Sequence, residues 1–304
     1  MRTSKITKIA AIFAVTLGLV LSGPTSAVNA WQLDYHLDTF DKLVMRPNPG
    51  AYWWVSHYGP DENGQLSFAE NVECAVGSCV KVVKDGFLNL NRFVRLELDE
   101  HPYAGVFTVA ELSELKNGVA EPNVPGRWNP DPYHPVILNY RLRFSDVYRR
   151  DGTGDAVGSV GVWLWNNPFG QTEVDPFEIY SGFGFTWQQD EGLAAQGLNA
   201  TLVRSTLPVY VAPAPAININ DWNIYTVVWS EDFNGEQTIS FFVNTHFVGS
   251  TPMIGGSLED LSLEIWVDNQ KFEFDPVTGG ANLVLEPIIE KQYVDIDYIF
   301  VTNT

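Results

Sequence analysis

Cysteine is scarce in this sequence, which contains only Cys74 and Cys79 among 304 residues. The two form a Cys-x4-Cys arrangement inside the segment Val72 to Val83. Two thiols without nearby histidines make a poor zinc site, because structural zinc takes four ligands. In an exported chain such a pair more often forms a disulfide. We therefore predict a local Cys74–Cys79 disulfide that closes a loop or hairpin, and neither a metal site nor a catalytic cysteine.

Basic residues are also few, since 18 lysines and arginines stand against 37 aspartates and glutamates, a formal net charge of −19 at pH 7. Residues 1–30 include three of the basic residues and no acidic one, so without them the charge goes from −19 to −22. Such an acidic chain is a poor match for nucleic acid, whose phosphates repel it. The same repulsion favours a neutral polymer over a strongly anionic one as a partner.

Beyond the N-terminal segment, no apolar run is long enough to span a membrane as a helix. The N-terminal segment itself has the basic, apolar and small residues of a secretory signal, in that order: Arg2, Lys5, Lys8, Ile9 to Leu21, Val28 and Ala30. We expect residues 1–30 to be removed and residues 31–304 to be secreted, either extracellular or periplasmic. The length of this remainder suits one large all-β domain, which we expect to be a monomer.

Helical periodicity is rare as well, because aromatic and β-branched residues dominate and Gly, Pro, Asn and Asp interrupt them at short intervals. The spacing of the expected strands favours a two-sheet sandwich over a propeller. Strands are predicted at residues 31–44, 51–57, 79–85, 87–91, 93–98, 136–144, 160–165, 222–229, 238–244, 246–250, 261–267 and 293–301. Short helices are expected within 107–115 and 190–199, and residues 188–220 are expected to form a long excursion over the sheet.

Several catalytic motifs are absent, namely the Gly-x-Ser-x-Gly elbow, the phosphate-binding loop and the His-Glu-x-x-His zinc helix. The sequence has instead Glu173-Val174-Asp175-Pro176-Phe177-Glu178, three carboxylates in six residues between two aromatic runs. In a regular strand Glu173 and Asp175 share one face, and Glu178 points away from it. A bulge at Pro176-Phe177 would return Glu178 to that face, and proline within a strand occurs mainly at edges and bulges.

Three carboxylates on one face repel one another, which lowers the stability of the fold and raises the pKa of at least one of them. Retaining glycosidases use this arrangement: an ionised nucleophile and a protonated acid lie roughly 5 to 5.5 Å apart across the scissile bond. A middle aspartate would orient the nucleophile and modulate its charge. The alternative is a solvated polar face of an edge strand with its carboxylates in water. The pattern alone leaves both interpretations open.

Two tryptophans, Trp163 and Trp165, alternate onto one face of the strand expected just before the acidic segment. Aromatic faces stack on the apolar faces of pyranose rings, so tryptophans beside carboxylates suit a sugar-binding cleft. Trp187 lies soon after the acidic segment and is a third candidate. Core packing explains any single tryptophan equally well. Three further tryptophans rank lower: Trp53, Trp54 and Trp128.

Histidines beside tyrosines indicate a different chemistry, proton abstraction by a polysaccharide lyase. Three pairs in the sequence allow it: His57 with Tyr58, His101 with Tyr103, and His134 with Tyr133. Such pairs are common by chance, so the lyase ranks well behind the glycosidase interpretation.

The acidic segment resembles the E-x-D-x-x-E active-site signature of glycoside hydrolase family 16. The strands around it are similar to those of the family: 140–144, 161–165, 221–229, 239–244 and 293–301. The resemblance covers residues 136–301, and the six-residue motif is its only specific part. It implies an all-β fold, a concanavalin A-like β-jelly-roll sandwich of two antiparallel sheets.

By this resemblance Glu173 would be the nucleophile, Asp175 the assisting carboxylate and Glu178 the acid/base. Pro176 departs from the aliphatic residue that usually follows the aspartate in the family. The family often carries a structural calcium, to which Asp297 would contribute, and the resemblance implies no other cofactor.

The leading interpretation is a secreted, endo-acting retaining glycoside hydrolase that cleaves β-linkages of a polysaccharide, either a laminarin-type glucan or an agar- or carrageenan-type galactan. The alternative is a non-catalytic, lectin-like protein on the same fold, which binds carbohydrate through Trp163, Trp165 and neighbouring aromatic residues. Both interpretations expect a polysaccharide partner, no nucleic acid and no membrane span.

Overall fold

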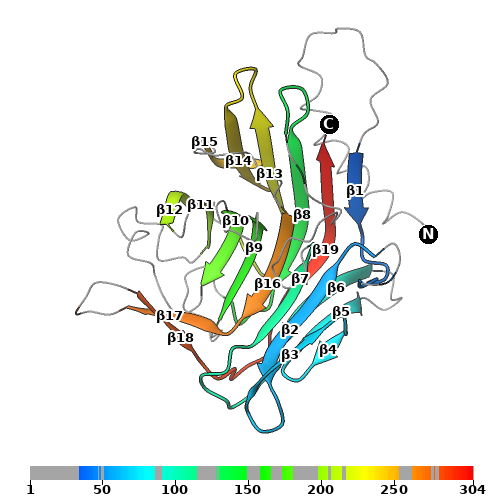
Figure 1. Cartoon of the computed structure of the whole chain (residues 1–304), viewed down its shortest axis with the longest axis vertical. Helices are drawn as coiled ribbons and strands as arrows, with labels where there is room; N and C mark the ends of the chain where they lie inside the picture. Colours follow the sequence, from blue (N-terminus) through cyan, green and yellow to red (C-terminus); the bar gives the residue numbers. More distant parts are fainter. Residues whose placement is uncertain are drawn as a thin grey trace. The chain divides into compact units, whose positions relative to one another are not determined.

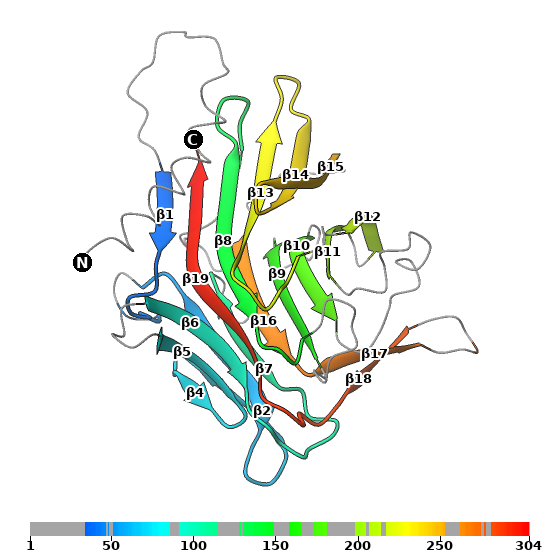
Figure 2. The same cartoon turned by 180° about the vertical axis from the view of Figure 1, so that it is seen from behind.

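The computed structural model contains two antiparallel β-sheets and a two-stranded ribbon (Figure 1 and Figure 2). It describes residues 34–46, 48, 51–85, 91–114, 128, 130–148, 158–165, 173–180, 198–204, 207–213, 217–252, 262–274, 277 and 281–303. The expected secretory signal, residues 1–30, lies outside the described residues. Within the described ranges no helix is long and apolar enough to cross a membrane.

The first sheet has nine strands, eight of which follow one another across it. Their order is β15 (His246–Pro252), β14 (Gln237–Val243), β13 (Asn223–Glu231), β8 (Val136–Phe144), β19 (Gln292–Asn303), β6 (Asn91–Leu98), β5 (Ser78–Asp85) and β4 (Cys74–Ala75). The ninth strand, β1 (Asp34–Asp38), pairs with β19.

The second sheet has eight strands and includes the acidic segment. Their order is β12 (Leu207–Pro213), β11 (Leu198–Arg204), β10 (Glu173–Tyr180), β9 (Ser159–Trp165), β16 (Ser262–Asp268), β7 (Val109–Ser113), β2 (Trp54–Pro60) and β3 (Leu66–Glu70). The ribbon consists of β17 (Gln270–Phe274) and β18 (Ala281–Leu285).

One apolar core joins the inner faces of the two sheets, as the predicted sandwich requires. In β14, Ile239, Phe241 and Val243 are buried and alternate with half-buried residues. Both sheets contribute to the same cluster of buried side chains, including Leu96, Leu142, Val227 and Ile296 from the first and Val55, Leu112, Val162 and Ile265 from the second. Because side chains alternate along a strand, the residues between these positions lie on the outer faces.

Two expectations for irregular or helical segments are wrong. Residues 107–115 contain a strand, β7, where a short helix was expected, because the segment pairs with β2 and β16 in the middle of the sheet. Residues 188–220 are not only an excursion, since they include the hairpin β11–β12, which extends the sheet beyond β10. Pro208 and Pro213 are tolerated there because β12 is an edge strand. Residues 190–197 of the second expected helix lie outside the described ranges, and Leu198 and Asn199 begin β11.

The local disulfide prediction is confirmed. Cys74 and Cys79 are bonded to each other and sit opposite one another in the β4–β5 hairpin. A tight turn at residues 232–235 connects β13 and β14, in which the Gly235 N–H donates to the Asp232 carbonyl at 3.0 Å. Gly235 has φ +79°, a conformation that favours glycine.

Candidate functional site

Strand β10 carries the three carboxylate positions of the acidic segment and lies between β9 and β11. On the β11 side they face alternate residues, Glu173 opposite Val203, Asp175 opposite Thr201, and Glu178 opposite Asn199. Alternate residues of a strand belong to one face of the sheet. The register therefore assigns all three acid positions to one face.

The β9 side gives the same result. Glu173 pairs with Trp165, and Glu178 pairs with Gly161. These acids are five positions apart in β10, whereas their partners are four apart in β9, so β10 contains an extra residue. The register shift lies between Asp175 and Glu178 on one side and between Val174 and Phe177 on the other. This is the bulge that the sequence predicts at Pro176-Phe177.

Two of the three candidate tryptophans lie in the neighbouring strand. Trp165 pairs with Glu173 in β10, and Trp163 pairs with Glu264 in β16. Being two residues apart, both have positions on the face of the acidic segment. Trp187 lies outside the described residues. Of the lower-ranked candidates, Trp53 is buried in the core, which fits the packing explanation.

A second group of residues shares this face, and the sequence analysis missed it. Reading across the sheet from Glu178, successive paired positions are Gly161, Trp266, Glu111, Ser56 and Glu70. The next row contains Trp163, Glu264, Ser113 and Trp54. Glu111 and Glu264 come from strands far apart in sequence, so no local motif joins them. The local signal in each strand is an acid with an apolar residue on either side.

Glu111 and Glu264 are enclosed, with 2% and 1% of their surface exposed. Burial, and the charge of Glu264 nearby, raise the pKa of Glu111 well above its ordinary value. Oε1 of Glu111 has no hydrogen-bond partner in the described part of the chain. These acids therefore form a second carboxylate site two strands or more from the acidic segment.

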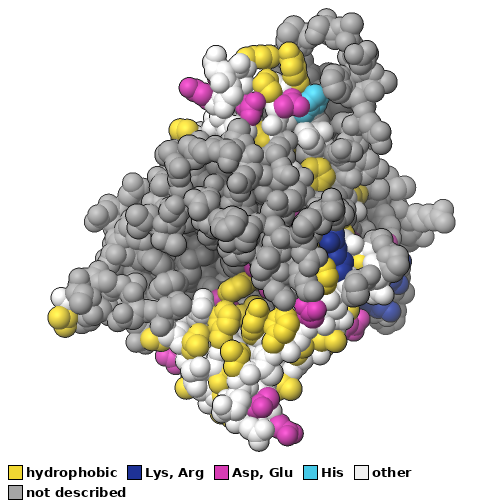
Figure 3. All heavy atoms as spheres, in the orientation of Figure 1, with side chains coloured by type: hydrophobic (Ala, Val, Ile, Leu, Met, Phe, Trp, Pro, Cys, Tyr) yellow, Lys and Arg dark blue, Asp and Glu magenta, His cyan; other side chains and the backbone are white. Residues whose placement is uncertain are grey.

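Four aromatic residues lie beside these acids, and we call them the aromatic strip: Phe68, Tyr58, Phe107 and Trp266. Adjacent ring centroids are separated by 4.9 Å from Phe68 to Tyr58, 5.8 Å from Tyr58 to Phe107, and 5.7 Å from Phe107 to Trp266. Phe68 is 46% exposed. Figure 3 shows hydrophobic side chains gathered at the surface over the part of the sheet that holds β2, β3, β7 and β16.

The histidine–tyrosine pairs give little support to a lyase. The ring nitrogens of His57 contact the Ser78 hydroxyl at 2.9 Å and the Val72 carbonyl at 3.0 Å. His57 and Tyr58 are adjacent in β2 and so belong to opposite faces. His101 contacts the Thr108 hydroxyl at 2.9 Å and accepts the Tyr103 backbone N–H at 3.3 Å.

In the third pair, His134 with Tyr133, the histidine also contacts another group. Nδ1 of His134 lies 2.8 Å from each carboxylate oxygen of Asp131 in a local turn. Tyr133 is 72% exposed and packs edge-on against Phe233, and its ring centroid lies 6.3 Å from that of His134 with the rings tilted by 55°.

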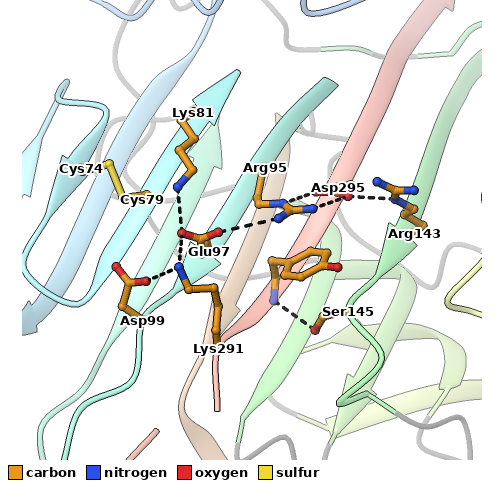
Figure 4. Close-up of polar contacts among 11 residues, drawn as sticks. Cys74, Cys79, Lys81, Arg95, Glu97, Asp99, Arg143, Ser145, Lys291 and Asp295 are labelled. Carbon is orange, nitrogen blue, oxygen red and sulfur yellow. Dashed lines mark hydrogen bonds and ion pairs between the residues drawn. A yellow bond between two sulfur atoms is a disulfide. The ribbon is translucent and has the colours of Figure 1, made fainter. Parts of the chain in front are cut away.

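The outer face of the nine-stranded sheet carries a network of ion pairs instead (Figure 4). Asp295 accepts hydrogen bonds from Arg95 at 2.6 and 2.9 Å and from Arg143 at 2.8 Å. Glu97 accepts from Lys81 at 2.8 Å and from Lys291 at 3.0 Å. A buried carboxylate without a partner charge lowers the stability of the fold, and these contacts give Asp295 and Glu97 such partners.

Asp297, the calcium ligand implied by the family resemblance, is 3% exposed and accepts from Arg141 at 2.7 Å. That arginine already supplies the positive charge that a cation would bring. Cys79, Glu97 and Asp99 are close enough together to hold an ion. Cys79 is bonded to Cys74, however, and Glu97 binds two lysines, so this group makes a poor metal site.

No protein-family model matches the sequence, and no curated protein matches it. Solved structures do resemble the fold. One is an endo-acting O-glycanase described from human gut microbiota that initiate mucin breakdown, with 12% identity, a TM-score of 0.50, and coverage of 88% of this chain and 97% of that one. A Bacteroides ovatus mixed linkage glucan GH16 protein has 12% identity and a TM-score of 0.48, with coverage of 88% and 99%.

A third similar structure is the carbohydrate recognition domain of Emp46p in its potassium-bound form. It has 7% identity and a TM-score of 0.39, and the match covers 73% of this chain and 85% of that domain. With the two sheets described above, the likeness to the endo-acting O-glycanase, at a TM-score of 0.50, defines the fold as a concanavalin A-like β-jelly-roll sandwich. At such low identity the likeness shows the fold alone.

Proposed function

We propose that this chain is a secreted, endo-acting retaining glycoside hydrolase that cleaves β-linkages of a polysaccharide. Glu173 acts as the nucleophile, Asp175 as the assisting carboxylate and Glu178 as the acid/base. Trp163, Trp165 and Trp187 bind the sugar rings beside these acids. This assignment follows the order that the sequence motif implies.

The observation that carries the proposal is the register shift in β10 between Asp175 and Glu178. Without it, Glu178 would lie on the opposite face from Glu173. The shift supports a joint role, because retaining hydrolysis needs two carboxyl groups on the same side of a substrate-binding surface. A merely solvated edge is a weaker explanation, since β10 is flanked by strands on both sides.

A carbohydrate-binding protein without catalysis is the second candidate. Pro176 favours it, because a proline inside the motif fixes the backbone within the bulge and lacks an N–H to donate. A small displacement of the acid relative to the nucleophile would stop the reaction, whereas aromatic stacking would continue.

The test is reducing-sugar release by the purified chain from laminarin, mixed-linkage glucan, agarose, porphyran and carrageenan. Glu178→Gln should lower the rate by about 10²–10⁴-fold because it removes the proton donor, and Glu173→Gln should abolish turnover while sparing binding. Glu290→Gln is the matched control, because Glu290 is exposed near the start of β19.

Release that survives in Glu173→Gln would refute the assignment of the nucleophile. No release from any polymer, with binding retained to one of them, would favour the binding protein. In that case Trp163→Ala should weaken binding strongly, and Pro176 would be the first residue to replace. Unsaturated products that absorb in the ultraviolet would identify a lyase.

A further inference from the structure

We infer that the aromatic strip is a binding surface for an uncharged polysaccharide chain, and that the substrate is therefore a neutral glycan and not a sulfated or uronic-acid polymer. The inference rests on the proposed function and names its substrate class. It depends on Phe68, Tyr58, Phe107 and Trp266, together with the carboxyl groups beside them.

The strip is continuous with the acidic segment. Trp266 pairs with Gly161, and Gly161 pairs with Glu178. Phe68, in β3, lies three strands beyond β16. The distance from β10 to β3 is five strand spacings, or about 24 Å. A surface of this length accommodates several consecutive sugar units, as an endo-acting enzyme requires.

The rings suit sugars because they are apolar and closely, regularly spaced; Phe68 is exposed, and Tyr58, Phe107 and Trp266 are half-buried. Their centroids are 4.9 to 5.8 Å apart. An apolar surface that is left uncovered on a sheet face indicates a binding site for a ligand or partner. Pyranose rings present apolar C–H faces to aromatic rings, while their hydroxyls remain free to donate hydrogen bonds.

Buried carboxyl groups lie on the same face, beside the strip. Oε1 of Glu111 and Oε2 of Glu70 have no hydrogen-bond partner in the described part of the chain. Both residues occupy the row that crosses the sheet from Glu178. The same acids act on the Tyr58 hydroxyl. Burial is the largest cause of its raised pKa, and the charges of Glu111, Glu264 and Glu70 raise that pKa further. Glu111, whose pKa is raised, holds its proton more readily than an ordinary carboxylate, so the acids beside the strip supply no positive charge to a sulfate or carboxylate group of the polymer.

No compensating cation lies in these strands. The sequences of β2, β3, β7 and β16 contain no lysine or arginine. Arg46 lies 5.7 Å from the ring of Trp54, which belongs to the neighbouring row of the same face. Its charge acts on Glu114, whose pKa it lowers in part. A polymer with one sulfate on each repeat would therefore find no lysine or arginine in β2, β3, β7 or β16 to pair with its sulfates.

The experiment measures the affinity of the Glu173→Gln chain for laminarin, chemically sulfated laminarin, agarose and carrageenan by affinity electrophoresis at low salt. The neutral polymers should bind, and sulfation of laminarin should weaken binding at least tenfold. Phe68→Ala should weaken binding to the neutral polymer by roughly three- to tenfold. Phe233→Ala is the control, since Phe233 is 76% exposed at the β13–β14 turn, outside the strip.

Equal binding of sulfated and unsulfated laminarin would overturn the substrate class. Equal affinities of Phe68→Ala and Phe233→Ala for the neutral polymer would overturn the strip as a sugar site. A dimer of the chain in sedimentation, disrupted by Phe68→Ala and not by Phe233→Ala, would also overturn it. Failure of the proposed function looks different, because the wild-type chain would then bind a neutral polymer through the strip and release no reducing sugar.

Discussion

Glu114 is a carboxylic acid enclosed at the end of β7, with none of its surface exposed. It accepts a hydrogen bond from the Tyr52 hydroxyl and another from the Leu263 N–H at 3.0 Å. Burial nevertheless raises its pKa from 4.5 to about 8, because desolvation outweighs these contacts. The folded protein therefore keeps a proton on Glu114 at a pH where the unfolded chain has lost it.

This proton makes stability depend on pH. Its contribution is fully present below pH 4.5, the ordinary pKa, and is lost as the pH rises to about 8. The free energy of unfolding should fall by up to about 1.4 kcal/mol per pH unit in this interval. Urea unfolding at several pH values should show that Glu114→Gln removes this part of the slope and that Glu290→Gln does not. A slope unchanged in Glu114→Gln would mean that Glu114 is ionised in the folded state.

The sequence points to candidate functional residues only where they are close together along the chain. Glu173, Asp175 and Glu178 are recognisable because a six-residue motif contains all three. Glu111 and Trp266 are 155 positions apart and meet only through the pairing of β7 with β16. Their proximity depends on register, which periodicity in single strands does not fix.

At the scale of elements, Asp295 connects three strands of the nine-stranded sheet. It lies in β19 and pairs with Arg95 of β6 and Arg143 of β8. Its side chain has 0% exposure. Removing its charge takes the nearest carboxylate from two partly buried guanidinium groups, which lowers stability because their remaining carboxylate partners are at 3.7 to 3.9 Å.

We predict that Asp295→Asn lowers the free energy of unfolding by roughly 3 kcal/mol, at the low end for a broken buried pair because both arginines are partly exposed. Asp85→Asn is a closely matched control. Asp85 also pairs with Arg143, at 3.7 Å, but it is 53% exposed, so its loss should cost about 0–1 kcal/mol. Urea unfolding of both variants tests this, and equal losses would contradict the role assigned to Asp295.

Strand prediction succeeded where local signals agreed. Val136–Phe144 was predicted with its observed bounds, and the β13–β14 hairpin follows from alternating residues on both sides of an Asp-Phe-Asn-Gly turn. The β11–β12 hairpin was missed because its two prolines indicate a loop. Only its position at the sheet edge, where backbone N–H groups have no partner strand, makes those prolines compatible with a strand.

At the scale of the whole molecule, the acidic residues outnumber the basic ones and repel one another. The formal charge of −19 for the full chain destabilises the compact state, because folding brings like charges closer together. Salt screens this repulsion over distances beyond about 8–10 Å. Salt also weakens exposed ion pairs, such as Lys291–Asp99, but each such pair contributes only about 0–1 kcal/mol. Buried pairs such as Arg95–Asp295 are screened much less.

The repulsion should therefore determine the sign of the salt effect. We expect the melting temperature at pH 7 to rise by roughly 2–4 °C between very low salt and about 0.15 M NaCl, equivalent to about 1 kcal/mol for a chain of this size. Near the sequence pI of about 4.5 the net charge is close to zero and the rise should disappear. Calorimetry at both pH values checks this. A melting temperature that falls with salt at pH 7 would mean that local ion pairs, such as those on the outer face of the nine-stranded sheet, contribute more than the net repulsion.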